Sequence, residues 1–331
     1  MDIAAICALL EQHLCQDAAA ANGCRCRVAA LSGARSYSQV FRANCDGISH
    51  TLFVKRCLHP GSGAADIDTA RTQFRGLQQA WRRSGRPARY NVPEPLLLVD
   101  SQAIVVTEWV QGPSLTQRLR RWNVAATELD RCMVQAAEWL SWYHRGKTIS
   151  PIQVDCEELI GRLRDGDPVV LRDQRFSQGC ELLRHTAARV SRVLTPRAEL
   201  HGDYKSDNLL IAGERVAAID IQPDFCNSVL FDIASFLNHL ELSAWHPKAW
   251  RMALRRQRLV QIFLQRYFET RVPPELVLAL AWVRLFNVLG AWLDSAAETS
   301  SRLRHRFAYF CYRRLVRSLI RELHVAAREI G

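Results

Sequence analysis

A chain of 331 residues has room for one large domain or two modest ones. Hydrophobic residues make up 48% of the chain and charged residues 23%, a balance that is ordinary for a globular enzyme and excludes a low-complexity protein. The formal net charge of +11 favours anionic partners such as ATP, phosphorylated substrates, nucleic acid or an anionic membrane. The alternative is an arginine-rich surface that only meets solvent.

The first third of the chain predicts a small β-rich unit. Apolar residues at helical spacing predict an amphipathic helix over 2–15. Three strands with two turns follow over 28–54, and the last strand runs into Lys55, which lies among apolar neighbours. The first turn, 31–38, is small and polar and is able to present backbone N–H groups to phosphates, although a plain hairpin loop is the simpler interpretation. A helix is predicted over 64–82.

The rest of the chain predicts one more hairpin and then mostly helices. Strands at 96–99 and 103–109 form the hairpin, and the second strand leads into an extended stretch that ends near Leu115. Residues 152–173 show no regular pattern and are expected to be irregular. Helices are predicted over 127–145, 174–194, 246–268, 274–293 and 301–329.

The cysteines and the apolar stretches indicate in which cellular compartment the protein is expected to work. Eleven cysteines form no C-x-x-C pair, and the closest spacing is that of Cys24 and Cys26. This predicts reduced thiols, as in a cytoplasmic protein. The first residues carry no basic run, so we expect no signal peptide. The apolar stretch 276–292 is interrupted by Arg284 and Asn287, which favours a buried helix over a transmembrane segment.

The most informative stretch runs from His201 to Asp220. Asp203 precedes Asn208 by five residues, and Leu209-Leu210-Ile211 then reads as a strand, 212–214 as its turn and 216–221 as the returning strand. Such a hairpin returns Asp220 to the end where Asn208 lies, facing Asp203. Two hard oxygen ligands, Asn208 and Asp220, suit Mg²⁺ shared with phosphates, and Asp203 is left to accept a proton from a hydroxyl.

This stretch resembles the catalytic loop of the protein-kinase-like fold, H-x-D-x-x-x-x-N. With His201-Gly202-Asp203, and with Ile219-Asp220 in place of D-F-G, it looks most like the aminoglycoside phosphotransferase and choline kinase branch. The resemblance covers about 28–242. It implies an α+β bilobal fold, with a β-rich nucleotide-binding lobe over 1–110 and a helical lobe over 111–331 that carries the catalytic loop and the acceptor site.

The same resemblance assigns roles to single residues. Asp203 is the base, and Lys205 neutralises the transferring phosphoryl group. Asn208 and Asp220 hold Mg²⁺. The nucleotide contacts implied are the phosphate loop with Gly33 and Ser36, the strand lysine Lys55, and the hinge backbone at the Glu108 carbonyl and the Val110 N–H.

Further residues are expected to support the loop or to depart from the pattern. Asp232 is expected to brace the catalytic loop, His201 to orient its backbone, and His144 to pack structurally. Gln73 stands where a glutamate usually pairs with the strand lysine. Asp66 or Asp68 is then a substitute, or Gln73 itself bonds Lys55. Gln222 stands where an acid or glycine is usual.

The implied function is an ATP- and Mg²⁺-dependent phosphotransferase acting on a hydroxyl of a small molecule of the aminoglycoside, choline or sugar type. A protein kinase of the same superfamily is one alternative, and a nucleotide-binding pseudokinase that acts as a scaffold is the other. No nucleic-acid partner is expected. The arginine-rich helix at 301–329 fits contact with an anionic surface, whereas a packed terminal helix with a solvated arginine face is the simpler interpretation.

Overall fold

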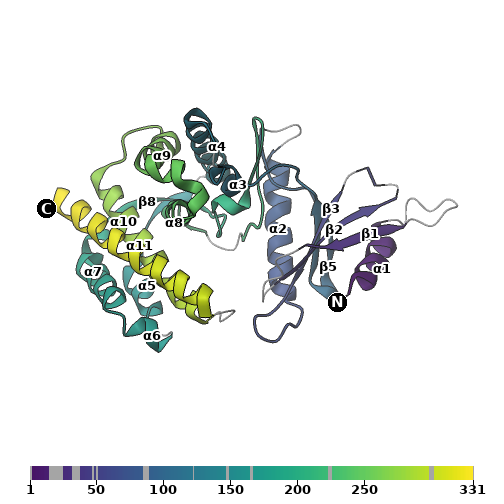
Figure 1. The fold of residues 1–331 in the computed structure, drawn as a ribbon, viewed down its shortest axis with the longest axis horizontal. Helices are drawn as coiled ribbons and strands as arrows, with labels where there is room; N and C mark the ends of the chain where they lie inside the picture. Colours follow the sequence, from purple (N-terminus) through teal and green to yellow (C-terminus); the bar gives the residue numbers. More distant parts are fainter. Residues whose placement is uncertain are drawn as a thin grey trace. The chain divides into compact units, whose positions relative to one another are not determined.

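The chain forms two compact units, Met1–Gly112 with Leu210–Asp224, and Pro113–Leu209 with Phe225–Gly331. A computed structural model describes residues 2–14, 25–31, 38–46, 48–49, 51–84, 89–121, 123–146, 149–164, 167–222, 226–297 and 302–330 (Figure 1). The first unit is built on antiparallel sheet and the second is mainly helical, which confirms the predicted α+β class.

The described part of the first unit is centred on a five-stranded antiparallel sheet with the order β1-β2-β3-β6-β5. Its strands are β1 (Cys26–Ala30), β2 (Ser38–Cys45), β3 (Leu52–Cys57), β5 (Pro95–Val99) and β6 (Ile104–Glu108). The helical elements are α1 (Ile3–Leu14), α2 (Ile67–Ser84) and the short 3₁₀ helix η1 (Asp100–Gln102).

The two faces of this sheet have different neighbours. Because side chains alternate along a strand, Leu52 and Val54 of β3 point to one face, where they join Ile6 and Leu10 of α1 in a buried cluster. Lys55, the next residue after Val54, points to the opposite face. Figure 1 shows α1 and α2 on opposite sides of the sheet. Lys55 therefore shares a face with α2.

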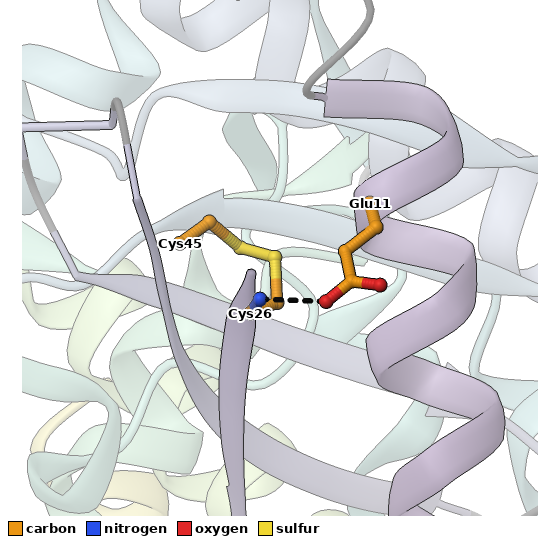
Figure 2. The surroundings of a disulfide bond; sticks show 3 residues. All are labelled: Glu11, Cys26 and Cys45. Carbon is orange, nitrogen blue, oxygen red and sulfur yellow. Dashed lines mark hydrogen bonds between the residues drawn. A yellow bond between two sulfur atoms is a disulfide. The ribbon is translucent and has the colours of Figure 1, made fainter. Parts of the chain in front are cut away.

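A disulfide joins the first two strands. Cys26 and Cys45 are directly opposed in the β1–β2 register, with 4.1 Å between their Cα atoms, and their sulfurs are bonded. The Glu11 carboxylate of α1 accepts a hydrogen bond from the Cys26 N–H at 2.8 Å (Figure 2). The prediction that the thiols are reduced is therefore wrong for this pair. The two cysteines come together only through the register of β1 and β2, which the spacing of residues in the sequence does not reveal.

The hairpin predicted after the catalytic loop is present. It consists of β9 (Leu209–Ala212) and β10 (Arg215–Ala218), which share a three-stranded sheet with β4 (Tyr90–Asn91). Gly213 makes the turn with a φ of 62°, a value that glycine adopts without strain. Asp220 follows β10 after one residue.

The second unit is mostly helical, with a three-stranded sheet of order β11-β8-β7 in its described part. Its strands are β7 (Ile149–Gln153), β8 (Leu194–Glu199) and β11 (Cys226–Ser228). Its helices are α3 (Leu115–Leu119), α4 (Ala126–His144), α5 (Cys156–Arg162), α6 (Pro168–Leu171), α7 (Gln174–Val190), η2 (Ser206–Asn208), α8 (Leu230–Ala244), η3 (Pro247–Ala249), α9 (Trp250–Phe268), α10 (Pro274–Ala297) and α11 (Arg302–Glu329).

Residues 152–173 are not irregular as predicted, because α5 and α6 lie within them. Each helix is short and begins at an aspartate. The Asp155 side chain accepts a hydrogen bond from the Glu158 N–H, and Asp167 caps α6, where Pro168 takes the first helical position. The helices are too short to show the 3.6-residue periodicity on which the prediction relied.

Helix α10 is the core helix of this unit. Among the described residues, Pro274–Ser295 is the one helical segment long and apolar enough to cross a membrane, and 72% of its apolar window is buried inside the protein. Its Arg284 donates hydrogen bonds to Glu241 at 2.8 Å and to Glu322 at 2.5 Å. Although burial opposes the charge, these carboxylates raise the pKa of the guanidinium. This network ties α8, α10 and α11 together.

Candidate functional site

The predicted catalytic loop connects β8 to β9 and is held by a buried carboxylate. Asp232 of α8 is 2% exposed, and its Oδ2 accepts hydrogen bonds from the His201 N–H at 2.7 Å and from His144 Nε2 at 3.0 Å. Its Oδ1 accepts from the Gly202 N–H at 3.0 Å. Gly202 has a φ of 81°, which favours glycine. The predicted bracing role of Asp232 and the structural role of His144 are confirmed.

Aromatic side chains support the loop from within the unit. Tyr204, the residue after Asp203, is fully buried, stacks on Trp139 at 5.6 Å between ring centroids, and donates from its hydroxyl to the Ala136 carbonyl at 2.6 Å. His201 is also fully buried, and its Nδ1 accepts from the Asp203 N–H at 3.3 Å. The backbone on both sides of Asp203 is therefore anchored, as was predicted for His201.

The two oxygens of the Asp203 carboxylate differ in the hydrogen bonds that they accept. Oδ2 accepts hydrogen bonds from Lys205 Nζ at 2.5 Å and from Asn208 Nδ2 at 3.0 Å. The Asn208 amide group also donates to the Asp203 carbonyl at 2.9 Å. Among the described residues, no hydrogen bond reaches Asp203 Oδ1. The two donors fix the orientation of the carboxylate and leave Oδ1 without a described donor.

The amide of Asn208 is oriented by these contacts. Since its nitrogen faces Asp203, its Oδ1 points the other way, and no described residue donates to it. An amide oxygen in this position is a hard donor of the kind that Mg²⁺ prefers. Asn208 is buried, so its orientation is fixed by the protein rather than by solvent.

A second polar network on the same loop was not anticipated from the sequence. Ser206 Oγ lies 2.7 Å from Thr116 Oγ1 and 2.8 Å from His239 Nδ1, and His239 Nε2 lies 3.2 Å from the Asp207 carboxylate. The hydrogen bond from His239, together with the charge of that ring, lowers the pKa of Asp207 to about 2. The network fastens η2 to α3 and α8.

In the first unit, Lys55 and Asp220 are in direct contact. Lys55 Nζ forms an ion pair with Asp220 Oδ1, and both side chains are mostly buried. Asp220 has a φ of 63°, in the left-handed region that non-glycine residues rarely adopt. Strain of this kind costs about 1–3 kcal/mol and is concentrated at functional sites. The geometry holds a carboxylate next to a cation at the end of the hairpin.

Neither alternative raised for the missing glutamate is observed. Gln73 of α2 is buried, and its Oε1 accepts a weak hydrogen bond from Cys57 Sγ at 3.8 Å rather than from Lys55. Asp66 caps the start of α2 by accepting from the Thr69 N–H at 3.0 Å. Asp220 is instead the observed partner of Lys55.

The end of β6 presents the backbone groups expected of a hinge. The Glu108 N–H donates to the Glu94 carbonyl at 3.0 Å, and the Glu108 carbonyl accepts from the Thr107 hydroxyl at 3.1 Å. No described residue accepts a hydrogen bond from the Val110 N–H. A carbonyl and an N–H two residues apart on extended chain match the donor and acceptor on one edge of adenine.

Gly112 follows the hinge and approaches β9 closely. Its φ is 138°, and a Cβ at this position would lie 3.1 Å from the Ile211 carbonyl oxygen. Both the backbone conformation and the close approach therefore require glycine. The predicted phosphate-loop residues Gly33 and Ser36 lie outside the described residues.

No protein-family model and no curated protein matches the chain, but solved structures do. A choline/ethanolamine kinase family protein from Mesorhizobium loti has a TM-score of 0.61 at 15% identity, covering 91% of this chain and 92% of that one. A thermostable mutant of the aminoglycoside phosphotransferase APH(4)-Ia, in a ternary complex with AMP-PNP and hygromycin B, has a TM-score of 0.62 at 16% identity, covering 95% and 98%. The choline kinase LicA from Streptococcus pneumoniae has 0.56 at 13%, covering 88% and 93%.

The chain has the fold of these small-molecule kinases. The resemblance inferred from the loop and hairpin residues is thus confirmed at the level of fold. Within this kinase fold, the structure places the predicted residues in three groups: Asp203 with Lys205 and Asn208, Lys55 with Asp220, and Glu108 with Val110.

The network of Thr116, Ser206, Asp207 and His239 is the part of the site region that the sequence did not predict. Thr116 lies two residues after Ser114, whose side chain caps α3, and His239 lies two turns after Asp232 on α8. The spacing of seven residues between Asp232 and His239 puts both on one face of that helix. This spacing was the one available signal.

Proposed function

We propose that the chain is a kinase that transfers the γ-phosphoryl group of ATP to a hydroxyl of a small molecule. The observation that carries the proposal is the Asp203 carboxylate, with Oδ2 held by Lys205 and Asn208 and Oδ1 available. A general base must be fixed and able to reach a proton, and the contacts of this carboxylate meet the first condition.

The reaction follows from the groups present. Asp203 Oδ1 accepts the proton of the acceptor hydroxyl as the hydroxyl oxygen bonds to the γ-phosphorus and the bond from that phosphorus to ADP breaks. Lys205 offsets the negative charge of the phosphoryl group while it moves. Because phosphoryl transfer needs little covalent chemistry from a protein, positioning and charge stabilisation account for most of the catalysis.

The nucleotide is assigned to the first unit. Lys55 contacts the α- and β-phosphates, the Glu108 carbonyl and the Val110 N–H meet adenine, and the loop with Gly33 and Ser36 covers the outer phosphates. The donors fit Mg²⁺, since Asn208 offers an amide oxygen and Asp220 a carboxylate. The ion, when bound, neutralises charge on the phosphates. On this assignment, residues 1–110 bind the nucleotide and 111–331 carry the base and the acceptor.

The class of acceptor is proposed from the solved structures that have the same fold. The aminoglycoside phosphotransferase of the same fold was solved with hygromycin B and AMP-PNP, and two further similar structures are of choline kinase type. A hydroxyl on a small molecule is the acceptor common to these proteins. We assign the same class of acceptor to this chain.

A pseudokinase is the second candidate, and one observation favours it. Gln73 bonds Cys57, and among the described residues Asp220 is the side chain that pairs with Lys55, so no side chain of α2 holds the lysine away from the carboxylate. A protein of this kind binds nucleotide without turning it over. Binding and turnover measured on the same sample separate the two functions.

The test has two stages. Nucleotide binding is measured by calorimetry with ATP and Mg²⁺ on the wild-type protein, on Asp220→Ala and on the control Glu157→Ala, which changes an exposed acid of α5. A set of hydroxylated metabolites, with protein acceptors beside them, is then screened with labelled ATP.

The proposal predicts that Asp220→Ala loses Mg²⁺-dependent binding and transfer while Glu157→Ala keeps both. Full activity in folded Asp220→Ala would rule out the metal assignment. Binding without transfer to any acceptor identifies the pseudokinase, and transfer to proteins alone identifies a protein kinase.

A further inference from the structure

A hollow lined by arginines lies between α7 and α11 in the second unit. These two helices lie side by side (Figure 1). The hollow has a volume of about 620 Å³, and the described residues that line it are Arg175, Phe310, Arg313, Arg314, Arg317 and Arg321. We refer to it as the arginine groove. None of these residues has a role in the phosphotransfer proposed above.

One buried carboxylate joins the two walls of the groove. Asp173 caps α7 by accepting from the Arg175 N–H at 2.7 Å, and its other oxygen accepts from the Tyr309 hydroxyl and lies 3.1 Å from Arg313 Nε. Asp173 is 7% exposed. The start of α7 and the face of α11 are therefore held together, and the groove is preformed.

Few of the described residues neutralise the charges in the groove. Arg175 donates to the neutral Gln178 at 3.0 Å, and Arg314 lies over the ring of Trp245 at 5.6 Å. No ion pair or hydrogen bond joins Arg317 or Arg321 to any described residue.

The acid next to Arg321 in the sequence is already engaged by an arginine outside the groove. Glu322, the neighbour of Arg321, is engaged by Arg284 of α10 at 2.5 and 2.7 Å. Among the described residues, the groove therefore has five guanidinium groups and the one neighbouring carboxylate of Asp173. Like charges gathered in a concave site raise the local positive potential and attract anions.

The size and lining of the groove favour a small ligand over a macromolecule. Its volume lies within the range of about 300–1,000 Å³ that is usual for small-molecule sites. From Arg313 to Arg321 the charges extend over about 12 Å along the helix axis, at about 1.5 Å per residue. The exposed ring of Phe310 adds one apolar surface to the lining of the hollow.

We propose that the arginine groove is a binding site for a small molecule that carries two or more phosphate groups. The guanidinium fork matches phosphate oxygens in pairs, and several arginines along one helix engage several phosphates at once. Phe310 contacts the organic part of such a ligand. The inference does not depend on the proposed kinase activity, because its residues and its ligand are separate from that chemistry.

The test measures binding of tripolyphosphate to the full chain by calorimetry near physiological ionic strength. Orthophosphate is the comparison ligand. The variant Arg317→Gln/Arg321→Gln removes two groove charges that have no described protein partner, so the fold is expected to persist. The matched control Arg271→Gln/Arg328→Gln removes two charges from exposed arginines that do not line the groove. Unfolding midpoints verify that both variants fold.

Two further probes address macromolecular partners. One is a single-stranded RNA oligonucleotide, and the other is a vesicle of equal parts phosphatidylserine and phosphatidylcholine. A macromolecular surface would bind one of them more tightly than tripolyphosphate.

The proposal predicts that tripolyphosphate binds more tightly than orthophosphate, that the groove variant weakens it about tenfold or more, and that the control variant changes it about twofold or less. Equal weakening by both variants would show general charge attraction and overturn the site. Tighter binding of RNA or of vesicles, lost in the groove variant, would assign the face to that macromolecule instead.

Discussion

Replacing Asp232 with asparagine tests how the catalytic loop is held. The carboxylate accepts hydrogen bonds from three donors, the His201 N–H at 2.7 Å, the Gly202 N–H at 3.0 Å and His144 Nε2 at 3.0 Å. Asparagine keeps the shape of the side chain but has one acceptor oxygen instead of two. In either orientation, its new NH₂ group faces at least one of these donors.

The magnitude follows from the burial and the charge. A hydrogen bond to a charged group is worth about 1.5–3 kcal/mol, and removing one partner from a buried pair costs about 3–5 kcal/mol. Since Asp232 is 2% exposed, water does not compensate for the loss. We expect Asp232→Asn to lower the free energy of unfolding by about 3–5 kcal/mol, within a total of about 5–15 kcal/mol.

The assay is urea unfolding followed by tryptophan fluorescence, combined with hydrogen exchange at the His201 and Gly202 amides. The control is Tyr267→Phe, which removes the hydroxyl that lies 2.7 Å from His144 Nδ1 and leaves the carboxylate intact. The control is expected to cost about 1 kcal/mol and to leave the loop amides protected.

The result that refutes this reasoning is specific. If Asp232→Asn costs less than about 1 kcal/mol and both amides stay as protected as in the wild type, the carboxylate does not hold the loop. Loss of protection confined to the loop would support the account even if the total stability changed less than expected.

Three further predictions concern single contacts. Asp207→Asn should lower the free energy of unfolding at pH 6 by about 1 kcal/mol, a value reduced for its partial exposure to solvent. The pKa of Asp207 is lowered from 3.8 to about 2, so this stabilisation is complete above pH 3.8 and is lost as the pH falls through 2. The urea midpoints of the variant and the wild type should therefore converge in acid. A difference that stays constant with pH would contradict the His239 contact. Cys26→Ser/Cys45→Ser should cost about 3 kcal/mol from the loop that the disulfide closes, measured by urea unfolding without reductant, and equal stability would mean that the bond does not form in solution. Gly112→Ala should cost about 1–3 kcal/mol, measured as a shift of the thermal midpoint, and an unchanged midpoint would contradict the φ of 138°.

The sequence predicted best what is local along the chain. The loop from His201 to Asn208 and the hairpin that follows carry fixed spacings, so residue types alone indicated their geometry. The bracing contacts of Asp232, which lies 31 residues after His201, were implied by the family resemblance instead. Local spacing is set by the covalent chain and by turn chemistry, which do not require knowledge of packing.

The sequence failed where distant segments decide the outcome. Cys26 and Cys45 are paired by strand register, and Lys55 pairs with Asp220 at the end of a distant hairpin although it shares a face of the sheet with α2. Asp207 and His239 meet through the packing of α8 on the loop. These contacts depend on tertiary packing, which periodicity and spacing do not encode.

The most direct test of the kinase proposal is the rate of phosphoryl transfer by Asp203→Asn, measured with labelled ATP, Mg²⁺ and the acceptor found by screening. Asparagine keeps the size of the side chain but does not take the hydroxyl proton. We predict that ATP binding is unchanged and that transfer falls about 10²–10⁴-fold, the usual contribution of a general base. Transfer at the wild-type rate by a folded Asp203→Asn protein would contradict the account.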